Sequence, residues 1–253
     1  MRSLAGGRSV AEIVSNSVLP AHREAIVLHT EDDLRLVGEL ATPLGPIEHT
    51  IVCLHPNPLQ NGYMDSHVLR KLAWRFPALF NSAVLRFNFR GVASRAGTSE
   101  GEHGYSIDEG KDLRAALEFV RERGLPKPWL LGWSFGTDVI LRHASTLDIA
   151  GAILLSPPLK WTTDAELDLW SDVATPVVCA VPEFDDFLQP AAARERFARI
   201  PHAQVIAAPG AKHLWIGEAQ VRQALEVIAR TVVGPGAVLP TEWDGPIERW
   251  TEQ

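Results

Sequence analysis

Short apolar runs recur along the chain and are separated by longer amphipathic stretches. Eight of these runs have the length and composition of β-strands, and most of the later ones are continuously apolar. Strands that are buried on both faces have this pattern, which is typical of a parallel sheet covered by helices. The predicted strands are residues 24–29, 34–40, 50–55, 83–88, 129–133, 151–156, 176–181 and 203–208.

Helical periodicity fills the gaps between these strands. Residues 113–120 and 221–232 each carry one apolar stripe, and further helices are expected over 65–80 (bent near Pro77), after Ser134 and over 191–199. Strands and helices alternate, and the first two strands form an antiparallel start. This order predicts one doubly wound α/β domain.

The predicted domain spans residues 24–233, between an N-terminal extension (1–23) and a C-terminal tail (234–253). The tail contains three prolines and the tryptophans Trp243 and Trp250. It is expected to lack regular structure and to dock on the domain through its indole rings. An exposed interaction tail is the alternative.

The segment Gly132-Trp133-Ser134-Phe135-Gly136 joins a predicted strand to a predicted helix. This is the G-x-S-x-G pattern in the strand–turn–helix context that makes the serine a nucleophile. The serine must lie on a very tight turn, and the two glycines leave room for that turn. The helix that follows directs its N-terminus at a developing oxyanion. A structural Gly-Ser turn is the alternative.

A serine hydroxyl needs a base and an orienting acid to react. For a nucleophile in this context, the acid and then the histidine follow along the chain. Among the histidines after Ser134, His143 lies too far along the helix and His202 lies at the wrong end of the sheet. His213 follows the last predicted strand and precedes the final helix. We therefore predict that His213 is the base; a loop histidine that caps the helix is the alternative.

Three carboxylates follow the predicted strand 176–181: Glu183, Asp185 and Asp186. One of them should accept a hydrogen bond from the other ring nitrogen of the histidine and stabilise the imidazolium. We predict Asp185, with Asp186 as the alternative, and consider Glu183 the least suitable. Asp138 suits the first turn of the helix after the serine better than this role.

An oxyanion site requires two backbone N–H donors. One should come from Phe135, the residue after the nucleophile, and the other from the loop His55-Pro56-Asn57-Pro58. Because the two prolines have no N–H, Asn57 is the predicted donor, and the prolines should hold it rigidly. His55 is expected to bond within the loop rather than to act as a base or a metal ligand.

Taken together, these segments resemble the α/β-hydrolase superfamily, especially its small lidless serine hydrolases, which are often labelled dienelactone-hydrolase-like. The resemblance rests on His55-Pro56-Asn57-Pro58, on Asn88-Phe89-Arg90-Gly91, on the G-x-S-x-G segment, and on the acid and base loops. It covers about residues 24–232. It implies an α/β-hydrolase fold with a mostly parallel eight-stranded sheet flanked by helices, and Ser134, Asp185 and His213 as the catalytic triad.

The resemblance also has departures. Asn57-Pro58 stands where the family usually has His-Pro, and Ser134 stands where true dienelactone hydrolases have cysteine, so that particular activity is not expected. Only residues 160–174 separate the sixth and seventh predicted strands. A large cap domain has no room there, and a single short helix is expected instead.

Several aromatic residues lie near the predicted triad along the chain. Some are expected to line an apolar substrate pocket, and burial in the core is the alternative for each of them. The predicted pocket residues are Trp133, Trp161, Phe187 and Trp215.

The 253 residues carry 24 basic and 31 acidic side chains, a net charge of −7. There is no run of Lys and Arg, so neither nucleic acid nor a membrane surface is an expected partner. The charge also disfavours strongly anionic substrates, unless Lys160, Lys212 or Arg90 supplies positive charge near the site. Cys53 and Cys179 lie in apolar runs and are expected to be buried.

No dinucleotide fingerprint and no metal-ligand spacing is evident, so neither a cofactor nor a metal is expected. The first thirty residues do not resemble a signal peptide, and no apolar run is long enough to span a bilayer, which favours a cytoplasmic protein.

The sequence thus predicts a carboxylesterase-like serine hydrolase that acts on a small or medium ester through an acyl-enzyme. A peptidase or thioesterase with the same triad is the first alternative. A non-catalytic binding protein of the same fold is the second, motivated by the acidic surface and the tail. The expected partner is the small-molecule ester, and homodimer formation is left open.

Overall fold

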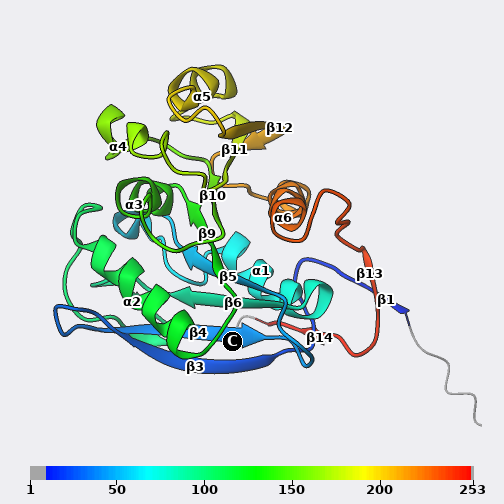
Figure 1. Ribbon diagram of the computed structural model, residues 1–253. Helices are drawn as coiled ribbons and strands as arrows, with labels where there is room; N and C mark the ends of the chain where they lie inside the picture. Colours follow the sequence, from blue (N-terminus) through cyan, green and yellow to red (C-terminus); the bar gives the residue numbers. More distant parts are fainter. Residues whose placement is uncertain (1–9, 252–253) are drawn as a thin grey trace, which may run out of the picture.

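One eight-stranded sheet forms the centre of the computed structural model, which describes residues 10–251 (Figure 1). The strand order is β12-β11-β10-β9-β5-β6-β4-β3. Strand β4 pairs antiparallel with β3 and β6, and the other pairs are parallel, which confirms the prediction of a mostly parallel sheet with an antiparallel start. The strands are β3 (His22–His29), β4 (Arg35–Thr42), β5 (His49–Leu54), β6 (Ser82–Phe87), β9 (Pro128–Trp133), β10 (Gly151–Leu155), β11 (Val177–Phe184) and β12 (Gln204–Lys212).

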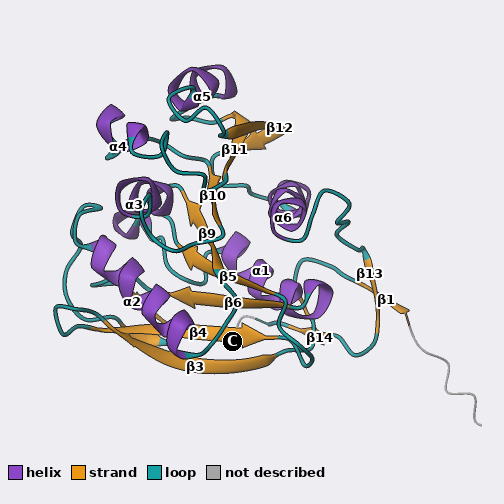
Figure 2. Ribbon diagram, viewed as in Figure 1, coloured by secondary structure: helices purple, strands orange, loops and turns teal. Residues whose placement is uncertain are grey.

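Helices cover both faces of this sheet (Figure 2). Helices α1 and α6 contribute to one buried apolar cluster, and α2 to α5 contribute to the other. In β5, Val52 and Leu54 belong to one cluster and Ile51 and Cys53 to the other, which explains why this strand is continuously apolar. The helices are α1 (His67–Phe80), α2 (Glu109–Glu122), α3 (Phe135–His143), α4 (Asp164–Asp168), α5 (Pro190–Phe197), α6 (Glu218–Val232) and the 3-10 turn η1 (Pro58–Gln60).

The connection between β10 and β11 is short and carries only the five-residue helix α4. Two side chains of this connection, Leu167 in α4 and Trp170 after it, are fully buried. The indole N–H of Trp170 donates to the carbonyl of Leu141 at 2.8 Å. Asp138 of α3 accepts hydrogen bonds from the backbone and the hydroxyl of Thr162, at 3.0 and 2.5 Å. The connection is therefore packed onto the body of the protein, and residues 10–251 include no cap domain over the sheet.

The prediction that the C-terminal tail lacks regular structure is wrong. Strand β13 (Glu242–Asp244) pairs antiparallel with β1 (Val10–Glu12), and β14 (Glu248–Arg249) pairs with β2 (Ser17–Val18). Each terminal extension thus supplies the backbone hydrogen-bonding partners of the other. Neither segment is long enough for its own sequence to predict a strand. Residues 1–9, where the absence of a signal peptide was expected, lie outside the described residues.

The tail does dock through an indole ring, as expected. The ring of Trp250 packs against Trp74 of α1, with 5.5 Å between the ring centroids. Its backbone N–H donates to the carbonyl of Asn16 at 2.9 Å, and the Asn16 side chain donates to the carbonyl of Trp250 at 3.0 Å. The ring contact and the backbone pairing hold the tail on α1 together.

Trp250→Ala should loosen this docking without unfolding the protein. A ring pair of this kind contributes about 0.5–1.5 kcal/mol, so the N–H of residue 250 should exchange about two- to tenfold faster in deuterium. Native-state hydrogen exchange measures this. Val238→Ala is the matched control, because Val238 lies in the same tail and is 71% exposed. Unchanged exchange at residue 250 would show that backbone pairing alone holds the tail.

Candidate active site

Ser134 lies at the junction between β9 and α3 in a backbone conformation that is strained for any residue other than glycine. Its φ is 52° and its ψ is −115°. The Ser134 N–H donates to the carbonyl of Leu155 at 2.9 Å, and the Ser134 carbonyl accepts from the N–H and the hydroxyl of Thr137, at 2.8 and 2.6 Å. These bonds on both sides fix the turn.

The two glycines of the turn are required by close packing. A Cβ on Gly136 would lie 2.2 Å from the carbonyl oxygen of Leu54, and a Cβ on Gly132 would lie 2.7 Å from the backbone of Gly136 and Thr137. Helix α3 therefore approaches β5 and β9 more closely than any side chain would permit. The sequence predicts that these glycines leave room for the tight turn, and the short Cβ distances agree with that role.

The structure brings His213 between Ser134 and Asp185. The Nε2 atom of His213 lies 2.9 Å from Ser134 Oγ, and its Nδ1 atom lies 2.8 Å from Asp185 Oδ2. All three residues are buried. An ionised carboxylate only accepts hydrogen bonds, so Nδ1 carries the proton and Nε2 is left to accept the hydrogen bond of the serine hydroxyl.

Asp185 is held independently of the histidine. It follows the last residue of β11, and its Oδ1 atom accepts the backbone N–H groups of Phe187 and Leu188 at 2.9 and 3.2 Å. The alternatives lie elsewhere: Asp186 is exposed, and Glu183 accepts from the N–H of Gly210 at 2.8 Å. The geometry therefore selects Asp185 among the three carboxylates.

The other two histidines after the serine also lie elsewhere. His143 Nε2 is 2.7 Å from the carbonyl of Ser106, and His202 Nε2 is 3.0 Å from the carbonyl of Thr175. Neither of these partners belongs to the Ser134 turn, so only His213 of the three candidates reaches the serine.

Three side chains, Ser156, Trp133 and Trp215, fix the loop of His213 by hydrogen bonds that the sequence does not reveal. The His213 carbonyl accepts hydrogen bonds from the Ser156 hydroxyl at 3.0 Å and from the Trp133 indole at 3.3 Å. Ser156 Oγ in turn accepts from the indole N–H of Trp215 at 2.9 Å. Ser156 follows β10, and its sequence context indicates only that the strand ends there.

The loop after β5 is anchored by His55, as expected. The His55 side chain is fully buried, with its Nδ1 atom 2.7 Å from the carbonyl of Pro56, and its Nε2 atom accepts the N–H of Phe89 at 3.0 Å. Because one nitrogen faces an acceptor and the other faces a donor, the ring is neutral with the proton on Nδ1. Burial lowers the pKa of His55 to about 4, although the hydrogen bond to Pro56 opposes that shift.

The same loop is a tight turn around Asn57. The Asn57 carbonyl accepts from the N–H groups of Gln60 and Gly62 at 3.0 and 2.9 Å, and the Asn57 side chain accepts from the N–H of Leu59 at 3.0 Å. A Cβ on Gly62 would lie 2.0 Å from the Pro56 carbonyl, so only glycine closes the turn. Asn57 lines the same cavity as Ser134.

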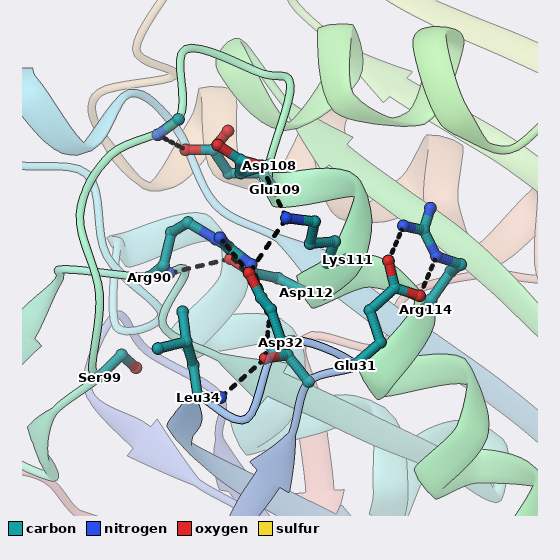
Figure 3. Close-up of polar contacts among 12 residues, drawn as sticks. Glu31, Asp32, Leu34, Arg90, Ser99, Asp108, Glu109, Lys111, Asp112 and Arg114 are labelled. Atoms are coloured by element: carbon teal, nitrogen blue, oxygen red, sulfur yellow. Dashed lines mark hydrogen bonds and ion pairs between the residues drawn. The ribbon is translucent and has the colours of Figure 1, made fainter.

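An ion-pair network centres on Arg90, the residue after the Phe89 that donates to His55 (Figure 3). The N–H of Arg90 donates to Asp112 Oδ2 at 2.9 Å, and its guanidinium reaches Asp112 Oδ1 at 2.7 Å and Asp32 at 3.0 Å. Burial raises the pKa of Asp32, but hydrogen bonds from Arg90, Thr30 and Lys111 outweigh it and hold that pKa well below the usual range. These bonds hold Arg90, which follows β6, against Asp112 of α2. The preceding residue, Phe89, donates its N–H to His55.

The cavity at Ser134 has a volume of about 390 Å³ and is more polar than predicted. Its lining includes Asn57, Tyr63, Arg70, Trp133, Ser134 and His213. Trp133 is the one predicted pocket residue in this lining.

The other three predicted pocket residues lie outside this lining. Trp161 packs edge-on against Phe135, and the 54%-exposed Phe187 packs against His213. The prediction that Trp215 lines the pocket is wrong: Trp215 is fully buried in the core, where its indole N–H donates to Ser156 and its carbonyl lies 3.1 Å from Nε2 of His67.

Cys53 and Cys179 are both buried and unpaired, and burial raises the pKa of the Cys53 thiol to about 12. Within residues 10–251, no group of three or more His, Cys, Asp or Glu side chains is placed to hold a metal ion. No helix in the same range is long and apolar enough to cross a membrane.

Comparisons with known proteins agree with this architecture. No family model matches the chain. An uncharacterized protein of Rickettsia prowazekii is 30% identical over 129 residues, which is 50% of this chain and 52% of that protein. The match thus spans about half the length of this curated relative.

Solved structures match over most of the chain. An α/β serine hydrolase homologue from Coxiella burnetii has a TM-score of 0.71 and 23% identity, over 87% of this chain and 99% of that one. An α/β serine hydrolase without lid from Xanthomonas campestris has a TM-score of 0.68 and 27% identity, over 85% and 96%. The Pf2001 esterase of Pyrococcus furiosus has a TM-score of 0.68 and 17% identity, over 85% and 94%. The chain therefore has the α/β-hydrolase fold, and like the Xanthomonas campestris structure it carries only a short connection where a lid would be inserted.

Replacing His55 should change how stability depends on pH. Burial places the folded pKa of His55 at about 4, below the ordinary value near 6.5. Between these values the unfolded chain binds more protons, so the contribution of His55 to stability falls as the pH falls. The difference in unfolding free energy between wild type and His55→Gln should therefore shrink by about 3 kcal/mol from pH 7 to pH 4.

Urea denaturation across this pH range measures that difference. His22→Gln is the matched control, because His22 is an exposed residue of β3. A difference for His55→Gln that stays constant with pH would contradict the assignment of a buried neutral ring.

Proposed function

We propose that this protein is a serine hydrolase that cleaves a small or medium carboxylic ester through an acyl-enzyme. The observation that carries the proposal is the position of His213, which bonds Ser134 Oγ with one ring nitrogen and Asp185 with the other. In serine hydrolases this arrangement turns a weak nucleophile into a reactive one.

In the proposed first half-reaction, Ser134 Oγ attacks the carbonyl carbon of the ester while His213 Nε2 accepts the hydroxyl proton. Asp185 stabilises the resulting imidazolium through its bond to Nδ1. The negative charge on the former carbonyl oxygen is stabilised by the N–H groups of Phe135 and Asn57, at the N-terminus of α3 and in the rigid proline loop. The intermediate then collapses, and the alcohol leaves with the proton from His213.

In the second half-reaction, a water molecule gives its proton to His213 Nε2 and attacks the acyl group on Ser134. Collapse of the second intermediate returns the proton to Ser134 Oγ and releases the carboxylic acid. The cycle consumes only the ester and water, and its first proton transfer joins Ser134 Oγ and His213 Nε2, which lie 2.9 Å apart.

The preference for a small or medium ester rests on the size of the cavity and on the short β10–β11 connection. A cavity of about 390 Å³ lies at the lower end of the range for small-molecule sites. The Pyrococcus furiosus esterase, which shares the fold, supports ester hydrolysis as the reaction class. A peptidase or a thioesterase would use the same triad, so the choice among the three depends on substrate comparison.

Matched variants should separate the acid of the triad from its neighbour. Asp185→Asn should lower kcat for 4-nitrophenyl butyrate by about 10³- to 10⁴-fold, because the amide leaves the imidazole in the wrong tautomer and the imidazolium without its counter-charge. Ser134→Ala should lower it by about 10⁴-fold or more. Asp186→Asn is the control and should keep kcat within about threefold, since the Asp186 side chain is exposed.

A fluorophosphonate probe should form a covalent adduct on Ser134 of the folded wild-type protein. Absence of that adduct, or turnover that Ser134→Ala leaves intact, would favour a non-catalytic binding protein of this fold. Wild-type kcat/KM should be higher for 4-nitrophenyl butyrate than for a butyryl thioester or an aminoacyl anilide. A higher value for the thioester or the anilide would assign the same triad to that substrate class instead.

A further inference from the structure

A second cavity, of about 280 Å³, adjoins the catalytic one. The two cavities share Tyr63, Asp65 and Arg70 in their linings. The rest of the second lining is Glu39, Trp74, Arg86, Arg95 and Trp250. A substrate seated at Ser134 could therefore extend past Arg70 into this second cavity.

Arg70 is held in this position by two indole rings. Its guanidinium carbon lies 5.0 Å from the ring centroid of Trp74 and 4.2 Å from that of Trp250. Contacts of this kind use the faces of the planar guanidinium, whereas its N–H groups point outward in the guanidinium plane. The side chain is thus ordered by aromatic contacts in a position where it lines both cavities.

The charges in this cavity make Arg70 distinct. Arg86 forms ion pairs with Glu39 and Asp65, each at 2.6 Å. Arg70 has no carboxylate partner within residues 10–251, and its Nε atom is buried with no hydrogen-bond partner there. The charge of Arg70 is therefore not neutralised by an ion pair, and a bound anion would neutralise it.

The charge of Arg70 favours an anion with a single negative charge. The two carboxylates of the lining, Glu39 and Asp65, are paired with Arg86, which leaves the charge of Arg70 in excess at the wall shared by the two cavities. This positive charge contrasts with the net charge of −7 of the whole protein. A single carboxylate neutralises the excess, and its two oxygens match the parallel N–H groups of a guanidinium.

The sequence pointed to other cations as sources of positive charge near the site. Arg90 is already bound to Asp112 and Asp32, and Lys160 lies over the ring of Trp161, 4.5 Å from its centroid. Neither Lys160 nor Lys212 lines the cavity at Ser134, whereas Arg70 does. Arg70 is therefore the cation that a substrate at Ser134 would meet.

We propose that Arg70 binds a carboxylate group of the substrate, so that the natural substrate is an ester that also carries one free carboxylate. This inference rests on the proposed function, because it places the carboxylate relative to an ester at Ser134. It assigns Arg70 a role in specificity, with Trp74 and Trp250 as the residues that hold its guanidinium in place.

Two matched pairs of esters test the proposal. Mono-4-nitrophenyl glutarate and 4-nitrophenyl valerate differ in a carboxylate on the acyl side, and 4-acetoxybenzoate and 4-methylphenyl acetate differ in one on the alcohol side. In at least one pair, wild-type kcat/KM should favour the charged ester. Arg70→Gln should reduce that preference about tenfold or more, and Arg70→Lys should restore it only in part, because lysine lacks the planar fork.

Arg194→Gln is the matched control, since it removes the same charge from an exposed position on α5 and should leave the preference unchanged. A preference that is absent in wild type, or that Arg70→Gln leaves unchanged in both pairs, would overturn the proposal. An equal loss on the charged and the neutral ester would also overturn it, because that result means a structural role.

A binding measurement separates this inference from the proposed function. Ser134→Ala protein is titrated with monomethyl glutarate and followed by tryptophan fluorescence, to which Trp74 and Trp250 beside Arg70 contribute. Saturable quenching that the further change Arg70→Gln abolishes supports the carboxylate site even if the wild type hydrolyses no ester. Hydrolysis of neutral esters without such quenching and without charge preference leaves the proposed function standing and refutes the carboxylate site.

Discussion

The arrangement of the site depends on one close contact, the approach of Gly136 to the carbonyl of Leu54. Without a side chain at that position, the N-terminus of α3 lies directly against the end of β5, and Ser134 can keep its strained conformation. The residue after Leu54 is His55, which begins the loop of Asn57. The contact that makes room for the nucleophile therefore also sets the distance between the two predicted oxyanion donors.

That contact brings the proline loop close to Ser134, and a chain of buried polar contacts fixes the loop there. His55 accepts the Phe89 N–H, and the next residue, Arg90, is bound through its backbone and its guanidinium to Asp112 of α2. Burying such an ion pair has a large desolvation cost, which several simultaneous hydrogen bonds offset. The network fixes the relative positions of three segments: α2, the segment after β6 that contains Phe89 and Arg90, and the proline loop after β5.

The central strands could be predicted because a strand that is buried on both faces is apolar throughout, so its end is visible. This places Ser134 directly after β9. Asp185 and His213 follow β11 and the edge strand β12, and they were predicted from their residue types and their order along the chain. Trp215 and Arg70 are different. Trp215 resembles a pocket residue until the partner of its indole N–H is known, and that partner, Ser156, lies 59 positions away. The helical pattern of α1 does not reveal that Arg70 faces two cavities, and the pairing of the two termini joins segments more than 200 residues apart.

The net charge of the protein also does not predict the charge at the site, because it is a sum over the whole surface and a ligand contacts only a small part of that surface. At physiological ionic strength, charges are screened over about 8 Å, so a group bound at Ser134 responds to the few residues around the cavity. Many of the acidic side chains are also paired with arginines, as in Glu24 with Arg123 and Glu31 with Arg114. An acidic protein can thus present a locally positive cavity, and the sign of a preferred substrate follows from which cation is left unpaired beside the nucleophile.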